Sequence, residues 1–341
     1  MNSPSQSGPP PHVALMQLVQ GLMFSKALQA VAELGIADLL ADSARTSAEL
    51  ARATSTDPSA LFRLLRALAG RGIFRQNESG LFENTALSEP LRSDGPTSVR
   101  DYVIYAPHDG NMRAWMHLMS VLQTGEPSFA AANGCEFWEY LQLHPDLSER
   151  FDRAMTALAS GNNRMVLEAY DFSPFATLID VGGGQGQLLS EILKAHPHLR
   201  GALFDLPAVA DGAGEYLVAQ GVADRCEFVP GDAFTSIPAG YEAYLLKNVL
   251  HDWSDDRCAV LLDRCREAIP PHGKLIIVDA VMVPGNDPHP AKMFDLHMMV
   301  ALGGRERTEE EFRGLLQRTG FKLTMAKSLP APIGIVEATP C

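Results

Sequence analysis

His251 is the residue whose type and position most clearly indicate acid–base chemistry. It follows an apolar run, residues 243–246, within the segment 247–253, which reads KNVLHDW. An imidazole titrates near neutral pH, so it can take a proton as a general base, and a nearby carboxylate can stabilise the cation that forms. Asp279 and Glu306 are the two acids expected to serve. The competing interpretation is structural, because a lone histidine is more often a surface or core group and Glu306 could be a carboxylate at a helix start.

A glycine-rich segment predicts a second chemical feature, a nucleoside site. Residues 178–186 read LIDVGGGQG, an apolar strand that runs into a glycine loop before a helix. Glycines let a ligand approach the backbone, and the helix start offers free N–H groups. A dinucleotide fingerprint needs a small residue where this chain has Gln187, so the pattern favours a ligand without a pyrophosphate. Asp205, nineteen residues after Gly186, is placed to accept from ribose hydroxyls. The alternative is a tight turn that needs small residues for its own geometry.

Other polar and aromatic residues follow the next expected strands. Asp232 and Phe234, in the sequence GDAF, could supply an acceptor and an aromatic face for an adenine ring. Lys247 ends the following apolar run. Ligands of open α/β sheets bind at the carboxyl ends of the strands, so these groups are expected to gather at one edge with His251.

The elements that must position these residues change in character near residue 172. After it, short apolar runs alternate with longer amphipathic helices, which is typical of a mostly parallel sheet and predicts the α/β class. The last two runs have no helix between them and are expected to pair as an antiparallel edge. The seven expected strands are residues 177–181, 201–204, 226–229, 243–246, 274–279, 322–328 and 333–338.

The first half of the chain is predicted to be mostly helical. Helices are expected at 13–40, at 47–53 with Ser47 as cap, and at 58–69 after Asp57. A hairpin around the turn 77–80 would complete the outline of a winged helix. Further helices are expected at 98–105, 112–123 and 146–170, and Thr308 with Glu311 is expected to form a capping box.

Composition excludes several classes of function. The 341 residues carry 28 basic and 41 acidic side chains, a net charge of −13, which disfavours nucleic acid and anionic membranes as partners. A DNA-binding winged helix is further disfavoured because residues 1–100 hold nine basic and nine acidic side chains. Five cysteines without a CxxC pair argue against disulfides and a zinc site and favour the cytoplasm. No membrane-spanning helix or secretion signal is expected, and residues 1–12 are expected to form a flexible tail.

The motifs together resemble a known family. The ordered set LIDVGGGQG, LFDLP, GDAF, LLKNVLHDW and GGRERTEEEF looks like the small-molecule O-methyltransferases of the plant caffeate and acetylserotonin type and their bacterial natural-product relatives. Residues 27–98 also resemble that family's winged-helix dimerisation domain. The resemblance implies S-adenosylmethionine as methyl donor, S-adenosylhomocysteine as product, a homodimer formed through the N-terminal domain, a small aromatic acceptor and a histidine base without a metal.

The resemblance also implies a role for each matching residue. His251 would be the general base, with the acids Asp279 and Glu306 beside it; Asp279 stands where the plant enzymes have the longer glutamate, so Glu306 is expected to be the nearer. The remaining roles fall on the donor site. Gly182, Gly184 and Gly186 would lie beside the methionine part of the donor, Asp205 at its ribose, Asp232 and Phe234 at its adenine, Lys247 near the ribose and carboxylate, and Met155 on the sulfonium side.

The resemblance divides the chain into four parts. These are a tail (1–12), a winged-helix-like dimerisation domain (13–105), a helical connector that lines the acceptor pocket (106–171), and a catalytic domain with a Rossmann-like methyltransferase sheet (172–341). Flat and adaptable apolar side chains are candidates to hold an aromatic acceptor, although residues of these types at helical spacing are usually core. They are Trp115, Met298 and Met299, with Phe137, Trp138, Met293 and His297 nearby in the sequence.

Three other reactions are compatible with parts of the sequence. N-methylation of a heteroaromatic ring would keep the fold and the donor and would need no base. A non-methylating reaction assisted by the same donor would also keep the fold. A nicotinamide oxidoreductase would share the glycine loop and Asp205, but it would leave the HDW and GDAF segments unexplained. His251 with acids nearby favours oxygen as the methyl acceptor.

Overall fold

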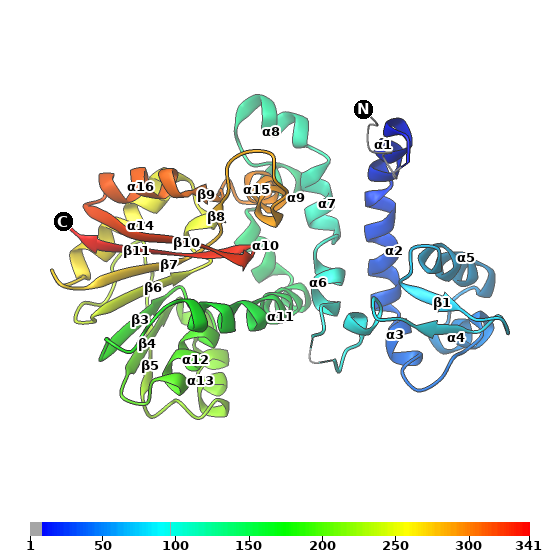
Figure 1. Ribbon diagram of the computed structural model, residues 1–341, viewed down its shortest axis with the longest axis horizontal. Coiled ribbons are helices and arrows are strands. Elements are labelled where there is room, and N and C mark those ends of the chain that lie inside the picture. The colour runs from blue at the N-terminus through cyan, green and yellow to red at the C-terminus, as the bar shows by residue number, and fades with distance from the viewer. Residues whose placement is uncertain (1–8, 96) are drawn as a thin grey trace, which may run out of the picture. The chain divides into compact units, whose positions relative to one another are not determined.

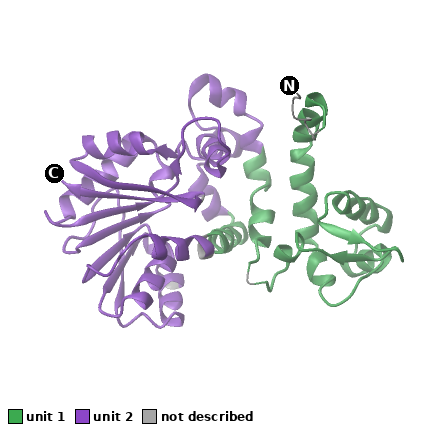
Figure 2. Ribbon diagram, in the orientation of Figure 1, with its two compact units in different colours: residues 1–112, 144–158 green, residues 113–143, 159–341 purple. Residues whose placement is uncertain are grey.

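The computed structural model describes residues 9–95 and 97–341 and divides the chain into two compact units. The first consists of residues 1–112 and 144–158, and the second of residues 113–143 and 159–341 (Figure 2). Two helices, α7 (Asp109–Trp115) and α11 (Pro145–Ala169), each contain a boundary between the units.

The second unit is built on a seven-stranded mixed sheet, as the sequence predicts (Figure 1). The strand order is β10-β11-β7-β6-β3-β4-β5, and the pairs from β7 through β5 are parallel. β11 runs antiparallel to both of its neighbours and lies one strand inside the edge. The strands are β3 (Thr177–Val181), β4 (Arg200–Asp205), β5 (Cys226–Pro230), β6 (Ala243–Lys247), β7 (Lys274–Val278), β10 (Phe321–Ala331) and β11 (Ile333–Pro340).

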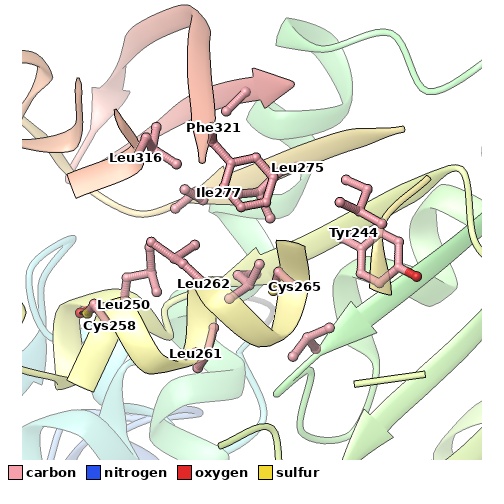
Figure 3. Close-up of a cluster of buried hydrophobic side chains, with 14 of the residues drawn as sticks. Tyr244, Leu250, Cys258, Leu261, Leu262, Cys265, Leu275, Ile277, Leu316 and Phe321 are labelled. Carbon is pink, nitrogen blue, oxygen red and sulfur yellow. Dashed lines mark hydrogen bonds between the residues drawn. The ribbon is translucent and has the colours of Figure 1, made fainter. Parts of the chain in front are cut away.

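Alternating strand residues feed two apolar layers, one on each face of the sheet. On β3, Ile179 and Val181 belong to one layer and Leu178 to the other, which is the period of two that a strand imposes. The first layer is completed by α14 (Asp255–Ala268) and α16 (Glu309–Arg318), and the second by α12 (Gln187–Ala195) and α13 (Ala210–Ala219) (Figure 1). Figure 3 shows side chains of β6, β7, α14 and α16 pointing toward one another in the first layer. This packing fixes the strand ends from which the polar residues project.

Shorter elements surround the sheet. The expected helix 112–123 is broken, because α7 ends at Trp115 and a new helix starts at Leu118. A two-stranded parallel sheet, β8 (Val281–Met282) with β9 (Arg307–Thr308), was not expected. The remaining elements are α8 (Leu118–Thr124), α9 (Phe129–Asn133), α10 (Phe137–Leu143), α15 (Pro290–Ala301) and the 3₁₀ turns η2 (Pro207–Val209) and η3 (Leu250–Asp252).

The first unit is mostly helical and contains the expected hairpin. The helix expected over 13–40 is divided at Gln20 and at Gly35, whose φ of 64° is a left-handed conformation. The cap of the fourth helix is Thr46 and not Ser47, because Thr46 and Glu49 form a capping box there. The elements are α1 (Pro11–Val19), α2 (Gly21–Glu33), α3 (Ile36–Leu39), α4 (Ser47–Thr54), α5 (Pro58–Ala69), β1 (Phe74–Gln76), β2 (Phe82–Asn84), η1 (Glu89–Leu91) and α6 (Arg100–Tyr105).

Of the tail expected over 1–12, residues 1–8 lie outside the described part, and Pro11 already begins α1. Asp57 caps α5 as expected, its carboxylate accepting from Ala60 N at 2.8 Å. In the described part of the chain, every helix is too short or too polar to cross a membrane.

Candidate functional site

The glycine loop connects β3 to α12 through three left-handed residues. Gly182, Gly184 and Gly186 have φ angles of 71°, 58° and 78°, which L-residues with a Cβ rarely adopt. Gly182 N donates to Phe204 O on the neighbouring strand at 2.8 Å, which anchors the start of the loop. A Cβ at Gly184 would meet no atom of the described residues within 4 Å. The loop is therefore tight at its ends and open at its centre.

Asp205 is hydrogen-bonded to the glycine loop and to its own strand end. Its Oδ2 accepts from Gly184 N at 2.8 Å, and its Oδ1 accepts from Leu206 N at 2.7 Å. Burial raises the pKa of this carboxyl, while the two N–H donors oppose that rise. Each carboxylate oxygen keeps a further lone pair, so the group can still accept hydrogen bonds from a ligand. The open backbone at Gly184 beside this acceptor fits a nucleoside.

Asp180 is buried against the glycine loop at the end of β3, and Lys247 is half-buried at the end of β6. Asp180 is 1% exposed and its Oδ1 lacks a hydrogen-bond partner in the described chain, which agrees with the expectation that it stays under the loop. Burial raises the pKa of Asp180 to about 7, against the attraction of Lys247. Burial also lowers the pKa of Lys247, which Asp180 and Glu191 oppose. Lys247 therefore brings a desolvated positive charge to the end of β6.

Asp232 and Phe234 follow β5, and one neighbour was missed by sequence reasoning. The Asp232 side chain is exposed and accepts from Phe234 N at 2.9 Å. The Phe234 ring meets Trp253 edge to face at a centroid distance of 4.8 Å. Arg257 lies over the Phe234 ring, with its guanidinium carbon 3.9 Å from the centroid. The sequence did not indicate this contact. Arg257 lies in the first turn of α14, which Ser254 caps, and the start of a helix is a sufficient explanation for the residues there.

His251 lies on η3, just beyond the carboxyl end of β6, among three carboxylates. Its Nδ1 is 3.0 Å from Glu306 Oε1, and its Nε2 is 3.4 Å from Asp252 Oδ1. Asp279 is 1% exposed, and neither of its carboxylate oxygens has a hydrogen-bond partner in the described chain. Glu306 is thus the acid that contacts the imidazole, in line with its expected greater reach. The approach of Asp252 was not expected, although its place next to His251 could have suggested it.

The carboxylates govern the protonation of this cluster. Burial by itself would lower the pKa of His251, but Asp252, Glu306 and Asp279 together raise it, to about 10. Burial raises the pKa of Asp252 to about 7 and that of Asp279 to about 6, while the imidazole opposes both shifts. His251, Asp252 and Asp279 titrate as a coupled set, with the imidazolium form favoured. A positive charge brought near the cluster would lower the pKa of His251.

The segment 303–308 holds the turn that carries His251. Arg305 N donates to His251 O at 2.9 Å, and a Cβ at Gly304 would overlap that same carbonyl. Arg307 is 1% exposed and donates to Leu250 O at 2.9 Å and to Trp253 O at 3.0 Å, the carbonyls on either side of His251. Arg307 was not among the expected site residues. The segment thus supplies both the acid for the imidazole and the support for its backbone.

A row of rings leads from His251 to Trp115. His251 and Phe294 have centroids 5.8 Å apart, and Phe294 and His297 have centroids 6.0 Å apart. Trp115 Nε1 donates to His297 Nδ1 at 3.1 Å. Phe294 was not predicted to belong to the site. The other expected residues are placed as follows: Met298 is buried, Met299 is half-buried, and Met155 lies half-buried on α11 in the first unit.

Models of two protein families match this chain. A model of the O-methyltransferase domain matches residues 115–322, and a model of the O-methyltransferase dimerisation domain matches residues 16–94. The chain belongs to the O-methyltransferase family. This protein is an S-adenosylmethionine-dependent O-methyltransferase, as the motifs predict.

Curated relatives of this O-methyltransferase are similar along nearly their whole length. Phenazine O-methyltransferase PhzM of Lysobacter antibioticus is 42% identical over 326 residues, which cover 96% of this chain and 95% of that protein. The mitomycin biosynthesis 6-O-methyltransferase of Streptomyces lavendulae is 40% identical over 327 residues (94% and 92%). An 8-amino-8-demethylriboflavin N,N-dimethyltransferase of Streptomyces davaonensis is 36% identical over 327 residues, 94% of each. The family therefore includes both O- and N-methyltransferases of aromatic compounds.

Solved structures show the same fold. The crystal structure of LaPhzM matches with a TM-score of 0.92 and 41% identity, and covers 98% of this chain and 100% of that one. NcsB1, an O-methyltransferase from neocarzinostatin biosynthesis, matches with a TM-score of 0.83 and 32% identity over 93% of this chain and 96% of that one. That structure contains S-adenosylmethionine and 2-hydroxy-5-methyl naphthoic acid. The predicted α/β fold with a helical dimerisation region is confirmed.

Proposed function

We propose that this O-methyltransferase transfers a methyl group from S-adenosylmethionine to a hydroxyl group of a small aromatic natural product, with His251 as general base. The observation that carries the proposal is the contact of His251 Nδ1 with Glu306 at 3.0 Å. This contact assigns the Nδ1 proton, so in the neutral imidazole Nε2, which lies 3.4 Å from Asp252 Oδ1, is the nitrogen that accepts the proton of the hydroxyl. A phenol has a pKa near 10, so removing its proton as attack proceeds makes the oxygen a better nucleophile.

The donor would be held by residues at the carboxyl ends of β3 to β6. Its sulfonium supplies an electrophilic methyl group when bound. Gly182, Gly184 and Gly186 let the methionine part approach the backbone, and Asp205 accepts from the ribose hydroxyls. Asp232 and Phe234 are assigned to the adenine, Lys247 to the ribose and carboxylate end, and Met155 to the sulfonium side. The open centre of the loop at Gly184, beside the Asp205 carboxylate, supports this assignment.

The protein's own contribution to the reaction is alignment, exclusion of water and proton removal. Proton removal by a positioned base contributes about 10² to 10⁴-fold. Glu306 holds the imidazole and stabilises the cation, and Asp279 adds negative charge from within the core. The positive charge of the bound donor would lower the pKa of His251, which the carboxylates raise, and so favours the neutral imidazole that the reaction needs. The proposed reaction uses no metal.

Different parts of the chain are assigned to the dimer interface and to the aromatic acceptor. We assign dimerisation to residues 13–105 and the catalytic sheet to residues 172–341, with Trp115, Met298 and Met299 against the aromatic acceptor. Exposed apolar side chains on α1 and α2 support a homodimer, because such a row is unusual on a monomer surface. They are Leu15, Met16, Leu18, Val19, Leu22 and Met23, with exposed fractions from 61% to 76%.

N-methylation of an aromatic amine is the second candidate, because one relative is an N,N-dimethyltransferase. The two reactions differ in their need for His251. Incubation with labelled donor and matched phenols and aromatic amines, followed by mass spectrometry, identifies the atom that is methylated.

The test of the base compares donor affinity with turnover. His251→Ala and His251→Gln are expected to bind the donor normally in calorimetry and to lose about 10² to 10⁴-fold in turnover with a phenol. His272→Ala, a change at an exposed histidine, is the matched control and should leave both unchanged. Unchanged turnover in the His251 variants would exclude this residue as the base.

A further inference from the structure

His297 is held in one neutral form by its contact with Trp115. Trp115 Nε1 donates to His297 Nδ1 at 3.1 Å, and the two rings are nearly parallel, with 8° between their planes and 6.3 Å between their centroids. An indole N–H can only donate, so His297 Nδ1 must be the nitrogen without a proton. The proton of the neutral ring therefore lies on Nε2. Burial supports this neutral form, because it lowers the pKa of His297 to about 4.

His297 and the proposed base, His251, share Phe294 as a neighbour. Phe294 and His297 lie three residues apart on α15, and so on one face of that helix. The Phe294 ring neighbours both imidazoles, with its centroid 5.8 Å from that of His251 and 6.0 Å from that of His297. A planar molecule whose hydroxyl reaches His251 can thus extend along Phe294 toward His297.

The Nε2–H of His297 has no hydrogen-bond acceptor among the described residues. Among the described residues, the only hydrogen bond that His297 makes is the one through Nδ1. A half-buried N–H donor costs free energy unless it finds an acceptor, so this group favours a ligand that supplies one. The neighbouring rings of Phe294 and Trp115 are flat apolar surfaces against which a planar ligand can pack.

We propose that His297 Nε2–H donates a hydrogen bond to the aromatic acceptor and thereby selects its class. The proposal rests on the function proposed above. The favoured acceptors carry, besides the hydroxyl that is methylated, an in-plane hydrogen-bond acceptor such as a carbonyl or carboxylate oxygen or a ring nitrogen. A plain phenol or naphthol leaves the donor unpaired and is disfavoured. In this selection Trp115 acts through His297, because it fixes the tautomer and does not itself make the hydrogen bond to the acceptor.

Binding of matched acceptors tests the proposal without any turnover. The probes are a hydroxynaphthoate and the corresponding naphthol, titrated into the full-length protein saturated with S-adenosylhomocysteine. The wild-type protein should bind the hydroxynaphthoate more tightly. His297→Asn can accept from Trp115 but has no group at the Nε2 position, so it should weaken hydroxynaphthoate binding about tenfold and leave naphthol binding unchanged. His297→Gln places an N–H near the Nε2 position and should recover most of the affinity.

The outcomes separate a hydrogen-bond donor from a packing residue. Equal loss for both probes in His297→Asn, with no recovery in His297→Gln, would mean that His297 only packs, and would overturn the proposal. A loss of turnover in His251→Ala with normal probe binding concerns the base alone, so failure of the two proposals can be told apart.

A spectroscopic measurement tests the tautomer directly. Nitrogen-15 chemical shifts of the His297 ring should show a protonated Nε2 and a bare Nδ1 in the wild-type protein. Trp115→Phe removes the indole donor and should let the proton populate Nδ1. A protonated Nδ1 in the wild-type protein would contradict the proposal.

Discussion

His251 and Glu306 are 55 residues apart in the sequence, and the imidazole Nδ1 lies 3.0 Å from the carboxylate Oε1. The carboxylate side chain is only 2% exposed and the imidazole side chain 12%, so water screens this pair weakly. Two more acids, Asp252 and Asp279, add to the charge around the ring. The environment thus favours the imidazolium, the form that general base catalysis produces.

The pH dependence of turnover is expected to follow from this arrangement. The base must be neutral, so activity rises with pH through the pKa of His251, which the carboxylates raise. Glu306→Gln removes one stabilising negative charge and lowers that pKa, so the rise in activity should move to lower pH. The maximal rate should fall about tenfold or more, because the cation formed during reaction is less stabilised. Rates are measured across pH at saturating donor. The control is Glu309→Gln, which changes an exposed carboxylate that pairs with Arg313 on the surface. A profile that stays in place in Glu306→Gln would exclude the proposed coupling.

Arg307 is expected to matter for stability as well as for rate. Its buried guanidinium bonds to Asp255 and to the carbonyls of Leu250 and Trp253. Arg307→Ala leaves these acceptors without their donor and should lower the free energy of unfolding by about 3 kcal/mol or more in urea denaturation. Arg313→Ala breaks an exposed pair on α16 and should change it by less than about 0.5 kcal/mol.

Arg307→Lys, a conservative change, separates the effect of Arg307 on His251 from its effect on stability. Arg307→Lys keeps the charge but lacks the planar fork that reaches both carbonyls. Turnover should fall while donor affinity in calorimetry stays the same, because only the turn that carries His251 loosens. Normal turnover in a folded Arg307→Lys protein would show that the carbonyl contacts do not position the base.

The sheet could be predicted from the sequence because each strand is an apolar run between turn residues. All seven expected strands are present, most with bounds that differ by one or two residues. Helix breaks were harder to predict. The apolar spacing continues through Gly35, where the left-handed φ of 64° ends the helical path, and tertiary packing decides such breaks. The capping residue of α4 was misplaced by one position for a similar reason, since Thr46 and Ser47 are both good caps.

The site was predictable as a set of strand ends and less so as a set of contacts. Residues after β6 and β7 share one edge, because these strands are parallel neighbours in the sheet, and this edge includes His251 and Asp279. Which acid meets the imidazole depends on side-chain length and on the backbone of the segment 303–308. The carbonyl contacts of Arg307 could not be foreseen, because nothing in the spacing tells a buried arginine from a surface one.

Gly184 offers a test of donor binding with a matched control. Gly184→Ala should lower the free energy of unfolding only modestly. A φ of 58° disfavours any side chain, but a Cβ there would meet no atom of the described residues within 4 Å. Gly221→Ala, after α13, has the same features at a φ of 71° and should cost a similar amount of stability. Only Gly184→Ala should weaken donor binding, by about tenfold or more, because its Cβ would occupy space proposed for the ligand. Equal donor affinity in the two variants would place the donor elsewhere.

Asp180 should make the stability of the donor-free protein depend on pH. Burial raises the pKa of its carboxyl to about 7, against about 3.9 in an unfolded chain. The folded state therefore holds the proton more tightly, and the stability that this provides is lost as pH rises from about 4 through 7. Asp180→Asn cannot ionise, so its free energy of unfolding relative to wild type should increase over that range, by about 1.4 kcal/mol for each pKa unit at most.

Urea denaturation of the donor-free protein at pH 5 and pH 8 measures this difference. Asp256→Asn changes a side chain that is 99% exposed and should give the same small difference at both pH values. Parallel curves for wild type and Asp180→Asn would mean that the carboxylate below the glycine loop stays ionised throughout. In that case Lys247 would have to compensate for its burial, and the lysine charge would be neutralised within the protein and less available to a donor carboxylate.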